Sequence, residues 1–233
     1  MVEIERVKTG IVGFDELVNG GFPKGNVILV SGATGCGKST FGGQFVYNGA
    51  NMFDEAGVYV TLEEDIDKII KNFSLYGWNL KKEIEKGRLL FIQPELYKYD
   101  VLLSTIEDAV DKIGATRLVI DSLSLVGMYF KDPFQIRKSL LEFNRTIKRL
   151  GCTTLATSEV KEGTGELSTF GVEEFVVDGI VLLYLIKKEN LFVRAITVRK
   201  MRGTAHSTRI HPLMMGANGL EVYPTEELFT AMP

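Results

Sequence analysis

The chain has 233 residues, 45% of them hydrophobic and 24% charged, which predicts one domain over residues 1–233 with a sizeable core. Its net charge of −3 argues against a general attraction to nucleic acids or acidic membranes, although a local patch stays open, and no apolar run approaches the ~20 residues that span a membrane. Because the first ten residues lack the apolar core of a signal peptide and Cys36 and Cys152 have no metal-ligand spacing, we expect a cytoplasmic protein.

The first 30 residues form a lead-in and a first strand. Residues 14–18 predict one helical turn, and the glycines and proline that follow predict a loop. Residues 27–30, VILV, are a continuous apolar run, which is typical of a strand buried on both faces.

A phosphate-binding loop follows this strand. Residues 32–39, GATGCGKS, match G-x-x-x-x-G-K-[ST] at every fixed position, and the next segment can form a helix with Phe41, Phe45 and Val46 on one side. Backbone N–H groups of a tight glycine-rich loop and the start of a helix together make an anion site. Lys38 should reach the β- and γ-phosphates.

These residues predict a site for ATP with Mg²⁺. The Ser39 hydroxyl should ligate Mg²⁺, with Thr40 as a less favoured substitute. The predicted nucleotide-binding residues are Gly32, Ala33, Thr34, Gly35, Cys36, Gly37, Lys38, Ser39 and Thr40. The thiol of Cys36 would lie near amide donors, a helix N-terminus and Lys38, an environment that favours the thiolate. We therefore expect alkylation of Cys36 to block nucleotide binding and MgATP to protect it. The alternative, which we favour over any regulatory redox role, is an incidental small residue at a variable position of the loop.

A second strand is predicted over residues 57–62, and it ends in the acidic cluster Glu63-Glu64-Asp65. Open α/β sheets place their sites at the carboxyl ends of strands, whereas acids before an apolar stripe also favour the start of a helix. We expect both roles. Glu63 or Glu64 would orient the attacking water, and Glu64 or Asp65 would cap the next helix.

A third strand is predicted over residues 88–93, after a short charged segment, and Asp100 is predicted to cap a helix that ends at Gly114. A fourth apolar strand, residues 117–122, ends in Asp121. A carboxylate at this position is the second half of a phosphate site, where it holds Mg²⁺, usually through water. The alternative is a turn aspartate.

The remaining predicted elements lead to a hairpin. Asp132-Pro133 opens a helix that Gly151 closes, and a fifth strand over residues 153–158 precedes Glu159. Glu159 could sense the γ-phosphate or simply end the strand. After a polar loop, residues 160–172, an apolar strand and its partner form a hairpin over residues 179–200.

Basic side chains gather near this end of the chain. They are Arg194, Arg199, Lys200, Arg202 and Arg209, with His206 and His211. One interpretation is a solvated hairpin face, and the other is that some of these cations reach the phosphates of a neighbouring subunit. The composition does not decide between them. Two histidines five residues apart are weak evidence for a metal, and we reject a metal site there.

The ordered motifs together resemble one family. They include TGIVGFDELVNGGFPKG before the phosphate loop, the loop itself, FDEAGVYVTLEED, KNFSLYGWNL, RLVIDS, FGVEEFVVDGIVLL, KMRGTAH and GLEVYP. They resemble the KaiC-like branch of the RecA/RadA-type P-loop ATPases, and within it the N-terminal, ATPase half of KaiC. The resemblance implies an α/β fold with a central, mostly parallel sheet flanked by helices and a C-terminal β-hairpin.

The resemblance also implies roles and an assembly. Ring-shaped hexamers with ATP at subunit interfaces are expected. Glu63 and Glu64 resemble the water-activating pair, and Asp121 resembles the acid on the Mg²⁺ side. Lys200 and Arg202 resemble the pair that contacts the γ-phosphate of the neighbouring subunit.

The chain departs from the second half of KaiC. That half carries adjacent Ser and Thr autophosphorylation sites, the Thr three residues before an Asp, whereas Glu174 and Phe175 stand before Asp178 here. The chain therefore resembles the ATPase half.

The leading hypothesis is a slow, Mg²⁺-dependent, oligomeric ATPase. It would act as a nucleotide-driven regulator of a protein partner that the sequence does not name.

Two alternative functions stay open. One is a RadA-like, DNA-associated ATPase, which we rank lower because the loop over residues 160–172 contains Lys161 but also Glu162 and Glu166, with Phe170 as its only aromatic residue. The other is a non-hydrolysing ATP-binding switch.

Overall fold

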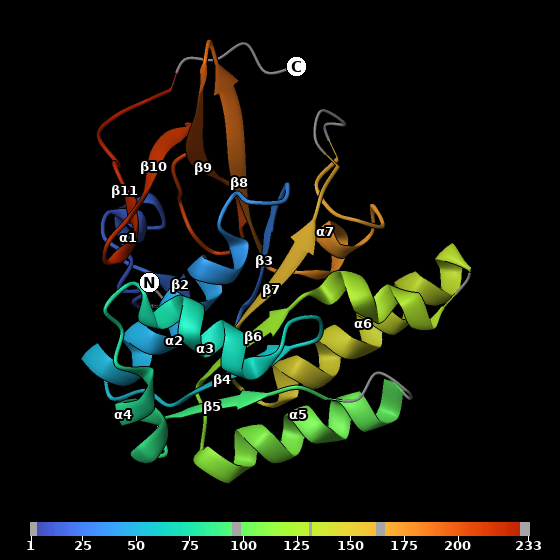
Figure 1. Cartoon of the computed structure of the whole chain (residues 1–233). Coiled ribbons are helices and arrows are strands. Elements are labelled where there is room, and N and C mark those ends of the chain that lie inside the picture. The colour runs from blue at the N-terminus through green and yellow to red at the C-terminus, as the bar shows by residue number, and fades with distance from the viewer. Residues whose placement is uncertain (1–3, 95–98, 131, 162–165, 229–233) are drawn as a thin grey trace.

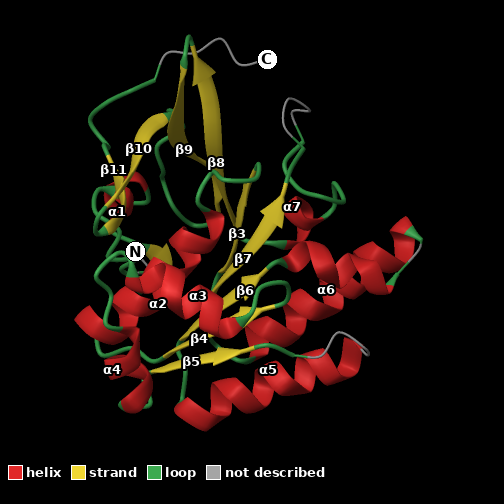
Figure 2. Ribbon diagram, viewed as in Figure 1, coloured by secondary structure: helices red, strands yellow, loops and turns green. Residues whose placement is uncertain are grey.

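The computed structural model has a central sheet with helices on both faces (Figures 1 and 2). It describes residues 4–94, 99–130, 132–161 and 166–228. The strands are β1 (Arg6–Val7), β2 (Phe22–Pro23), β3 (Val27–Gly32), β4 (Gly57–Thr61), β5 (Leu89–Ile92), β6 (Arg117–Asp121), β7 (Thr153–Glu159), β8 (Gly179–Lys188), β9 (Leu191–Met201), β10 (His211–Gly216) and β11 (Gly219–Val222). The helices are α1 (Phe14–Leu17), α2 (Lys38–Met52), α3 (Ile66–Ser74), α4 (Leu80–Glu85), α5 (Tyr99–Ile113), α6 (Pro133–Arg149) and α7 (Glu173–Val176), with a 3₁₀ helix η1 (Leu123–Tyr129).

Within the described ranges, the main sheet has nine strands in the order β11-β10-β9-β8-β3-β7-β6-β4-β5. The six strands from β8 to β5 are parallel. The strands β9, β10 and β11 extend the sheet with antiparallel pairs. The predicted fold class, a mostly parallel α/β sheet with a C-terminal hairpin, is confirmed.

Alternate side chains of the parallel strands enter two separate cores. Ile28 and Val30 pack on the face covered by α2, α3 and α4, whereas Val27 and Leu29 pack on the face covered by α5 and α6 (Figure 2). A strand that is covered on both faces needs apolar side chains on both. This is why residues 27–30 read as a continuous apolar run.

Helix α2 is buried on all sides rather than along one stripe. Every residue from Phe41 to Ala50 is buried. The N-terminal segment and β11 cover its outer side, where the Gln44 amide donates to the Leu220 carbonyl at 3.1 Å. A Cβ at Gly43 would lie 2.4 Å from the Phe73 ring, so glycine permits the close approach of α3.

Two predicted helix caps are confirmed, and a third is wrong. The Asp65 carboxylate accepts from the N–H groups of Asp67 and Lys68 at the start of α3, and Asp132 accepts from Gln135 at the start of α6. Asp100 lies inside α5, which already includes Tyr99, and so it is an acidic residue of the first turn rather than the cap.

Several elements were not predicted. The charged segment before β5 forms α4, because the Asn79 side chain caps it and Leu80 and Glu83 are buried. The short elements β1, β2, η1, α7, β10 and β11 also lie in segments that were interpreted as loops or left unassigned. Glu162, one of the acids of the predicted polar loop, lies outside the described residues. No helix in the described part of the chain is both long and apolar enough to cross a membrane.

The β8–β9 hairpin runs the full length of the sheet and projects beyond it (Figure 1). Arg194 on β9 pairs with Leu185, near the carboxyl end of β8, whereas Lys200 pairs with Ile180 near its amino end. Basic residues of one strand therefore lie at opposite ends of the sheet.

Candidate functional site

A cleft lies at the carboxyl ends of four adjacent strands, β3, β7, β6 and β4. The residues that follow these strands come together there, as expected for an open α/β sheet. The cleft has a volume of about 370 Å³. Its lining residues are Thr34, Gly35, Gly37, Lys38, Ser39, Thr40, Thr61, Glu63, Glu64, Asp121, Ser122, Glu159, Arg194 and Met215.

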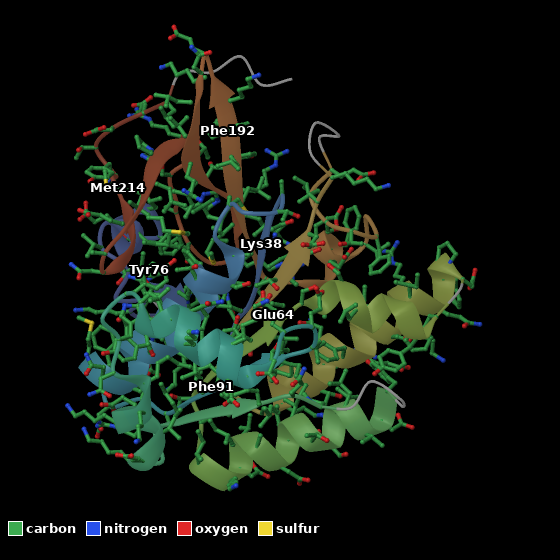
Figure 3. All side chains as sticks on the ribbon, viewed as in Figure 1. Lys38, Glu64, Tyr76, Phe91, Phe192 and Met214 are labelled. Atoms are coloured by element: carbon green, nitrogen blue, oxygen red, sulfur yellow. The ribbon has the colours of Figure 1, made fainter. Side chains whose placement is uncertain are left out.

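The phosphate loop forms one wall of the cleft. Gly37 adopts φ 109°, a conformation that an L side chain rarely takes, and α2 begins at the next residue. The Lys38 ammonium donates to the carbonyls of Gly32 at 2.9 Å and Ala33 at 3.0 Å. Figure 3 shows Lys38 and Glu64 at this end of the sheet. Of the predicted nucleotide-binding residues, Gly32, Ala33 and Cys36 do not line the cleft.

Asp121 is held by two hydroxyl groups from the neighbouring strands. Tyr59 on β4 donates to Asp121 Oδ2 at 2.6 Å, and Thr157 on β7 donates to Asp121 Oδ1. Burial raises the pKa of Tyr59 well above its usual range, and the Asp121 carboxylate adds to the rise, while the Ser39 side chain acts in the opposite direction. The phenol therefore stays a donor at neutral pH.

The acidic pair Glu63-Glu64 divides into two environments. The Ser122 hydroxyl donates to Glu63 at 3.3 Å, and burial, followed by the charge of Glu159, raises the pKa of Glu63. The Glu64 carboxylate lies 3.5 Å from the ammonium of Lys68, and its side chain is half-exposed. Both side chains are exposed, and Glu63 lies next to the negative charges of Glu159 and Asp121.

The donor set suits Mg²⁺. Ser39 and Asp121, the two predicted ligands, offer oxygen atoms in the same cleft. Within the described residues, no group of three or more His, Cys, Asp or Glu side chains could hold a metal by itself. Mg²⁺ is usually bound through one or two protein oxygens together with substrate phosphates, so these two residues fit a metal that arrives with a nucleotide.

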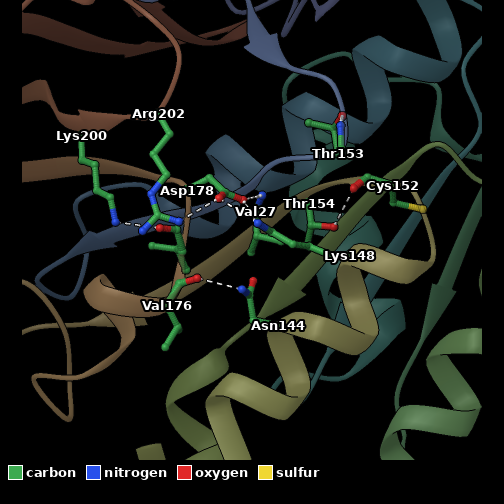
Figure 4. Close-up of polar contacts among 12 residues, drawn as sticks. Val27, Asn144, Lys148, Cys152, Thr153, Thr154, Val176, Asp178, Lys200 and Arg202 are labelled. Carbon is green, nitrogen blue, oxygen red and sulfur yellow. Dashed lines mark hydrogen bonds and ion pairs between the residues drawn. The ribbon is translucent and has the colours of Figure 1, made fainter.

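Lys200 and Arg202, drawn in Figure 4 with their polar contacts, lie beside the amino end of β8, at the opposite end of the sheet from the cleft of their own chain. The Lys200 ammonium donates to the carbonyls of Glu174 at 3.1 Å and Val177 at 2.7 Å. Arg202 donates to Asp178 Oδ1 at 3.3 Å. Neither cation lines the cleft. Within one chain, the structure separates these two predicted catalytic residues from Lys38, Glu63 and Glu64.

Sequence reasoning missed part of the lining. Arg194 was grouped with the other basic residues, but its guanidinium donates to the Gly35 carbonyl in the phosphate loop at 3.1 and 3.3 Å. Tyr59 and Thr157, which contact Asp121 from behind the lining, were not singled out within the strands predicted over residues 57–62 and 153–158. The available signal was the alternation of side chains along each strand, which places Tyr59 and Thr61 on one face. To conclude from it that Tyr59 meets Asp121, one also needs the register between β4 and β6.

The expected reactivity of Cys36 is wrong. Its side chain is fully buried, and burial raises the pKa of the thiol. The charge of Lys38 and the nearby amide groups lower it, but by less than burial raises it. The thiol therefore stays protonated and shielded, and the predicted alkylation loses its chemical basis.

Comparison with known proteins decides the family. A protein-family model described as "ATPase: KaiC" matches residues 7–227. The chain belongs to the KaiC family of ATPases. The predicted resemblance is thereby confirmed, and membership supports nucleotide binding.

Relatives of this KaiC-family chain fall into two length classes. It is 35% identical over 232 residues to the circadian clock oscillator protein KaiC of Thermostichus vulcanus, covering 95% of this chain and 45% of that protein. The chain thus spans about half the length of the KaiC proteins it matches. It is also 37% identical to a UPF0273 protein of Methanocaldococcus jannaschii, covering 97% of this chain and 99% of that protein.

A solved structure shares the fold. It is the crystal structure of a KaiC-like protein from the archaeon Pyrococcus horikoshii OT3, with a TM-score of 0.89 and 40% sequence identity. The match covers 95% of this chain and 100% of that one.

Proposed function

We propose that this KaiC-family chain binds ATP with Mg²⁺ in the cleft and hydrolyses it slowly. The observation that carries the proposal is the convergence of the phosphate loop, Ser39, Asp121 and Glu63 at one end of the sheet. The loop amides and Lys38 would hold the phosphates, and Ser39 and Asp121 would hold the metal. Mg²⁺, when bound, would neutralise charge on the phosphate oxygens.

Glu63 is the better candidate to activate water. An ionised carboxylate next to other acids accepts a proton more readily than one paired with a cation. The Glu64 carboxylate lies 3.5 Å from the Lys68 ammonium, and we assign Glu64 a supporting role. Glu63 would therefore orient the attacking water and accept its hydrogen bond, while Lys38 stabilises the charge that develops on the transferred phosphoryl group.

We further propose that the active unit is an oligomer, a hexameric ring in the form that the family resemblance implies. Lys200, near the end of β9, and Arg202, just after it, lie beside the amino end of β8, at the opposite end of the sheet from the cleft of their own chain. A cation supplied by a neighbouring subunit can contribute ~10³-fold or more to turnover. These two residues would act in trans, so an isolated subunit would be an incomplete enzyme. One-domain behaviour of residues 1–233 and a cytoplasmic location stay predictions.

The proposal is tested with mixed subunits. Arg202→Ala and Lys38→Ala are expected to be inactive alone, and a mixture should regain activity because some interfaces combine an intact loop with an intact cation. Phosphate release is measured over a range of mixing ratios and total concentrations, with oligomer size followed by light scattering. Arg209→Ala is the matched control, since Arg209 is an exposed cation paired with Glu227. Mixed rings that stay inactive at every ratio would contradict the action in trans.

The alternatives are separated by two further measurements. Tight ATP binding by the wild-type protein without phosphate release at any concentration would favour the non-hydrolysing switch. Steeply salt-dependent binding of single-stranded DNA would favour the DNA-associated ATPase. Capture experiments under ATP and under ADP, read by mass spectrometry, would identify the protein partner.

A further inference from the structure

The Asp121 carboxylate is oriented by hydroxyl groups on both sides. In the parallel register, Thr61 on β4 pairs with Asp121 and Ala156 on β7 pairs with Ile120. Tyr59 lies two residues before Thr61 on the same face of β4, and Thr157 follows Ala156. Donors from the two flanking strands thus converge on one carboxylate, each on a different oxygen.

The Tyr59 side chain is rigidly placed. It is fully buried, with its ring stacked on Phe91 at a centroid distance of 5.4 Å and edge-on to Phe73 at 5.7 Å. A phenylalanine would fill the same space without burying a polar atom, and a buried hydroxyl is unfavourable unless it is hydrogen-bonded. Its hydrogen bond goes to the carboxylate of Asp121 at 2.6 Å. The aromatic ring alone accounts for the packing, so the hydroxyl group must have another role.

Neutral donors orient a carboxylate without cancelling its charge. Hydroxyl groups fix both Asp121 oxygens and bring no positive charge to the cleft. The Ser39 side chain also lies close enough to the phenol to influence it. One of the two proposed oxygen ligands of Mg²⁺ is therefore bonded directly to a buried phenol.

We propose that Tyr59 is a positioning residue for the metal site: its hydroxyl, together with that of Thr157, holds the Asp121 carboxylate in the orientation that serves Mg²⁺. The inference rests on the proposed function of the cleft. Groups that orient a metal ligand from behind typically contribute ~10–100-fold to metal affinity. Tyr59 would act only through Asp121, and ATP binding without metal would not need it.

The test is Tyr59→Phe, measured by metal binding as well as by activity. Mn²⁺ affinity in the presence of a non-hydrolysable ATP analogue is read by electron paramagnetic resonance, and ATP affinity is measured with Mg²⁺ and with EDTA. We expect Mn²⁺ affinity to fall ~10–100-fold and ATP affinity in EDTA to stay unchanged. The matched control is Tyr99→Phe, which removes a phenol hydroxyl that donates to the Ser139 carbonyl at 2.8 Å, away from the cleft. It should leave Mn²⁺ affinity unchanged.

A double-mutant cycle separates positioning from structure. In an Asp121→Asn background, Tyr59→Phe should cause no further loss of Mn²⁺ affinity, whereas additive losses would overturn the proposal. A folded Tyr59→Phe protein with wild-type Mn²⁺ affinity would overturn it too. If Tyr59→Phe does not fold, Thr157→Val removes the other donor, and unchanged Mn²⁺ affinity there refutes the paired role. Failure of the proposed function looks different: wild-type protein would then bind ATP equally well with Mg²⁺ and with EDTA, and the role of Tyr59 would fall with the metal site.

Discussion

Two aspartates lie at opposite ends of the same sheet, and their surroundings differ in charge. Asp121, at the carboxyl end of β6, accepts hydrogen bonds from the hydroxyls of Tyr59 and Thr157. Those donors are neutral, and the hydrogen bonds of the two cations that line the same cleft, Lys38 and Arg194, go to carbonyls of the phosphate loop. Glu63 and Glu159 add further negative charge beside Asp121.

Asp178, before the amino end of β8, is in the opposite situation. Lys148 pairs with it at 2.8 Å and Arg202 at 3.3 Å, and the N–H of Val27 donates to it at 3.1 Å (Figure 4). Its charge is offset within the chain, and it ties β3, β8 and α6 together. We infer from this comparison that an aspartate at the end of an apolar strand can serve a cation where its partners within the chain are neutral.

The largest expected effect is on the turnover number, kcat, and comes from a change in the cleft. Glu63→Gln should lower kcat by ~10²–10⁴-fold with little loss of ATP affinity, because the amide cannot accept a proton from the attacking water. Glu64→Gln is the matched control and should cost less, since its carboxylate is paired with Lys68. Steady-state phosphate release and equilibrium nucleotide binding provide the two measurements. Unchanged turnover in both variants would mean that these two acids serve only at the start of the helix that follows them.

The next effect concerns nucleotide affinity at the same end. Lys38→Ala should raise the Kd for ATP by ~100-fold or more, because charge-assisted contacts are worth about 1.5–3 kcal/mol each and the loop would lose its cation. Isothermal titration calorimetry measures the change. Lys81→Ala, an exposed lysine on α4, should bind ATP like the wild type. Equal affinities for Lys38→Ala and the wild type would remove the phosphate-loop assignment.

A smaller expected effect, on the free energy of unfolding, tests the comparison of the two aspartates directly. Asp178→Asn should lower the free energy of unfolding by about 1–2 kcal/mol, because Lys148 and Arg202 lose a buried counter-charge while both stay partly solvated. Asp121→Asn should leave stability equal or higher, because it removes a carboxylate whose hydrogen-bond donors are neutral and that lies beside other acids. It should still lose the Mg²⁺-dependent part of ATP affinity. Urea unfolding of both variants measures the difference, and equal destabilisation would contradict this contrast.

The smallest effect is a shift with pH. Only the ionised Glu63 carboxylate can accept a proton, so kcat falls as the pH drops through its pKa. Burial and the charge of Glu159 raise that pKa, so the fall should occur at a higher pH than for an ordinary glutamate. Glu159→Gln removes one negative neighbour and should move the acid limb of the kcat profile to lower pH. An unmoved or raised limb would contradict the coupling.

Some parts of this protein follow from short stretches of sequence. The phosphate loop needs only consecutive residues, because Gly37 permits the turn and Lys38 begins the helix that follows. The caps Asp65 and Asp132 act within three residues of themselves. These features depend on local backbone geometry, which residue type and spacing largely determine.

Only the tertiary structure decided the rest. The hydrogen bond from Tyr59 to Asp121 joins residues 62 positions apart. The register of β9 against β8 places Arg194 beside the phosphate loop and Lys200 at the far end, although six positions separate them in the chain. Burial raises the pKa of Cys36, which its charged neighbours alone would lower. In each case the outcome depends on which strands are adjacent, in what register, and how much solvent their packing excludes, and these are properties of the whole sheet rather than of any one segment.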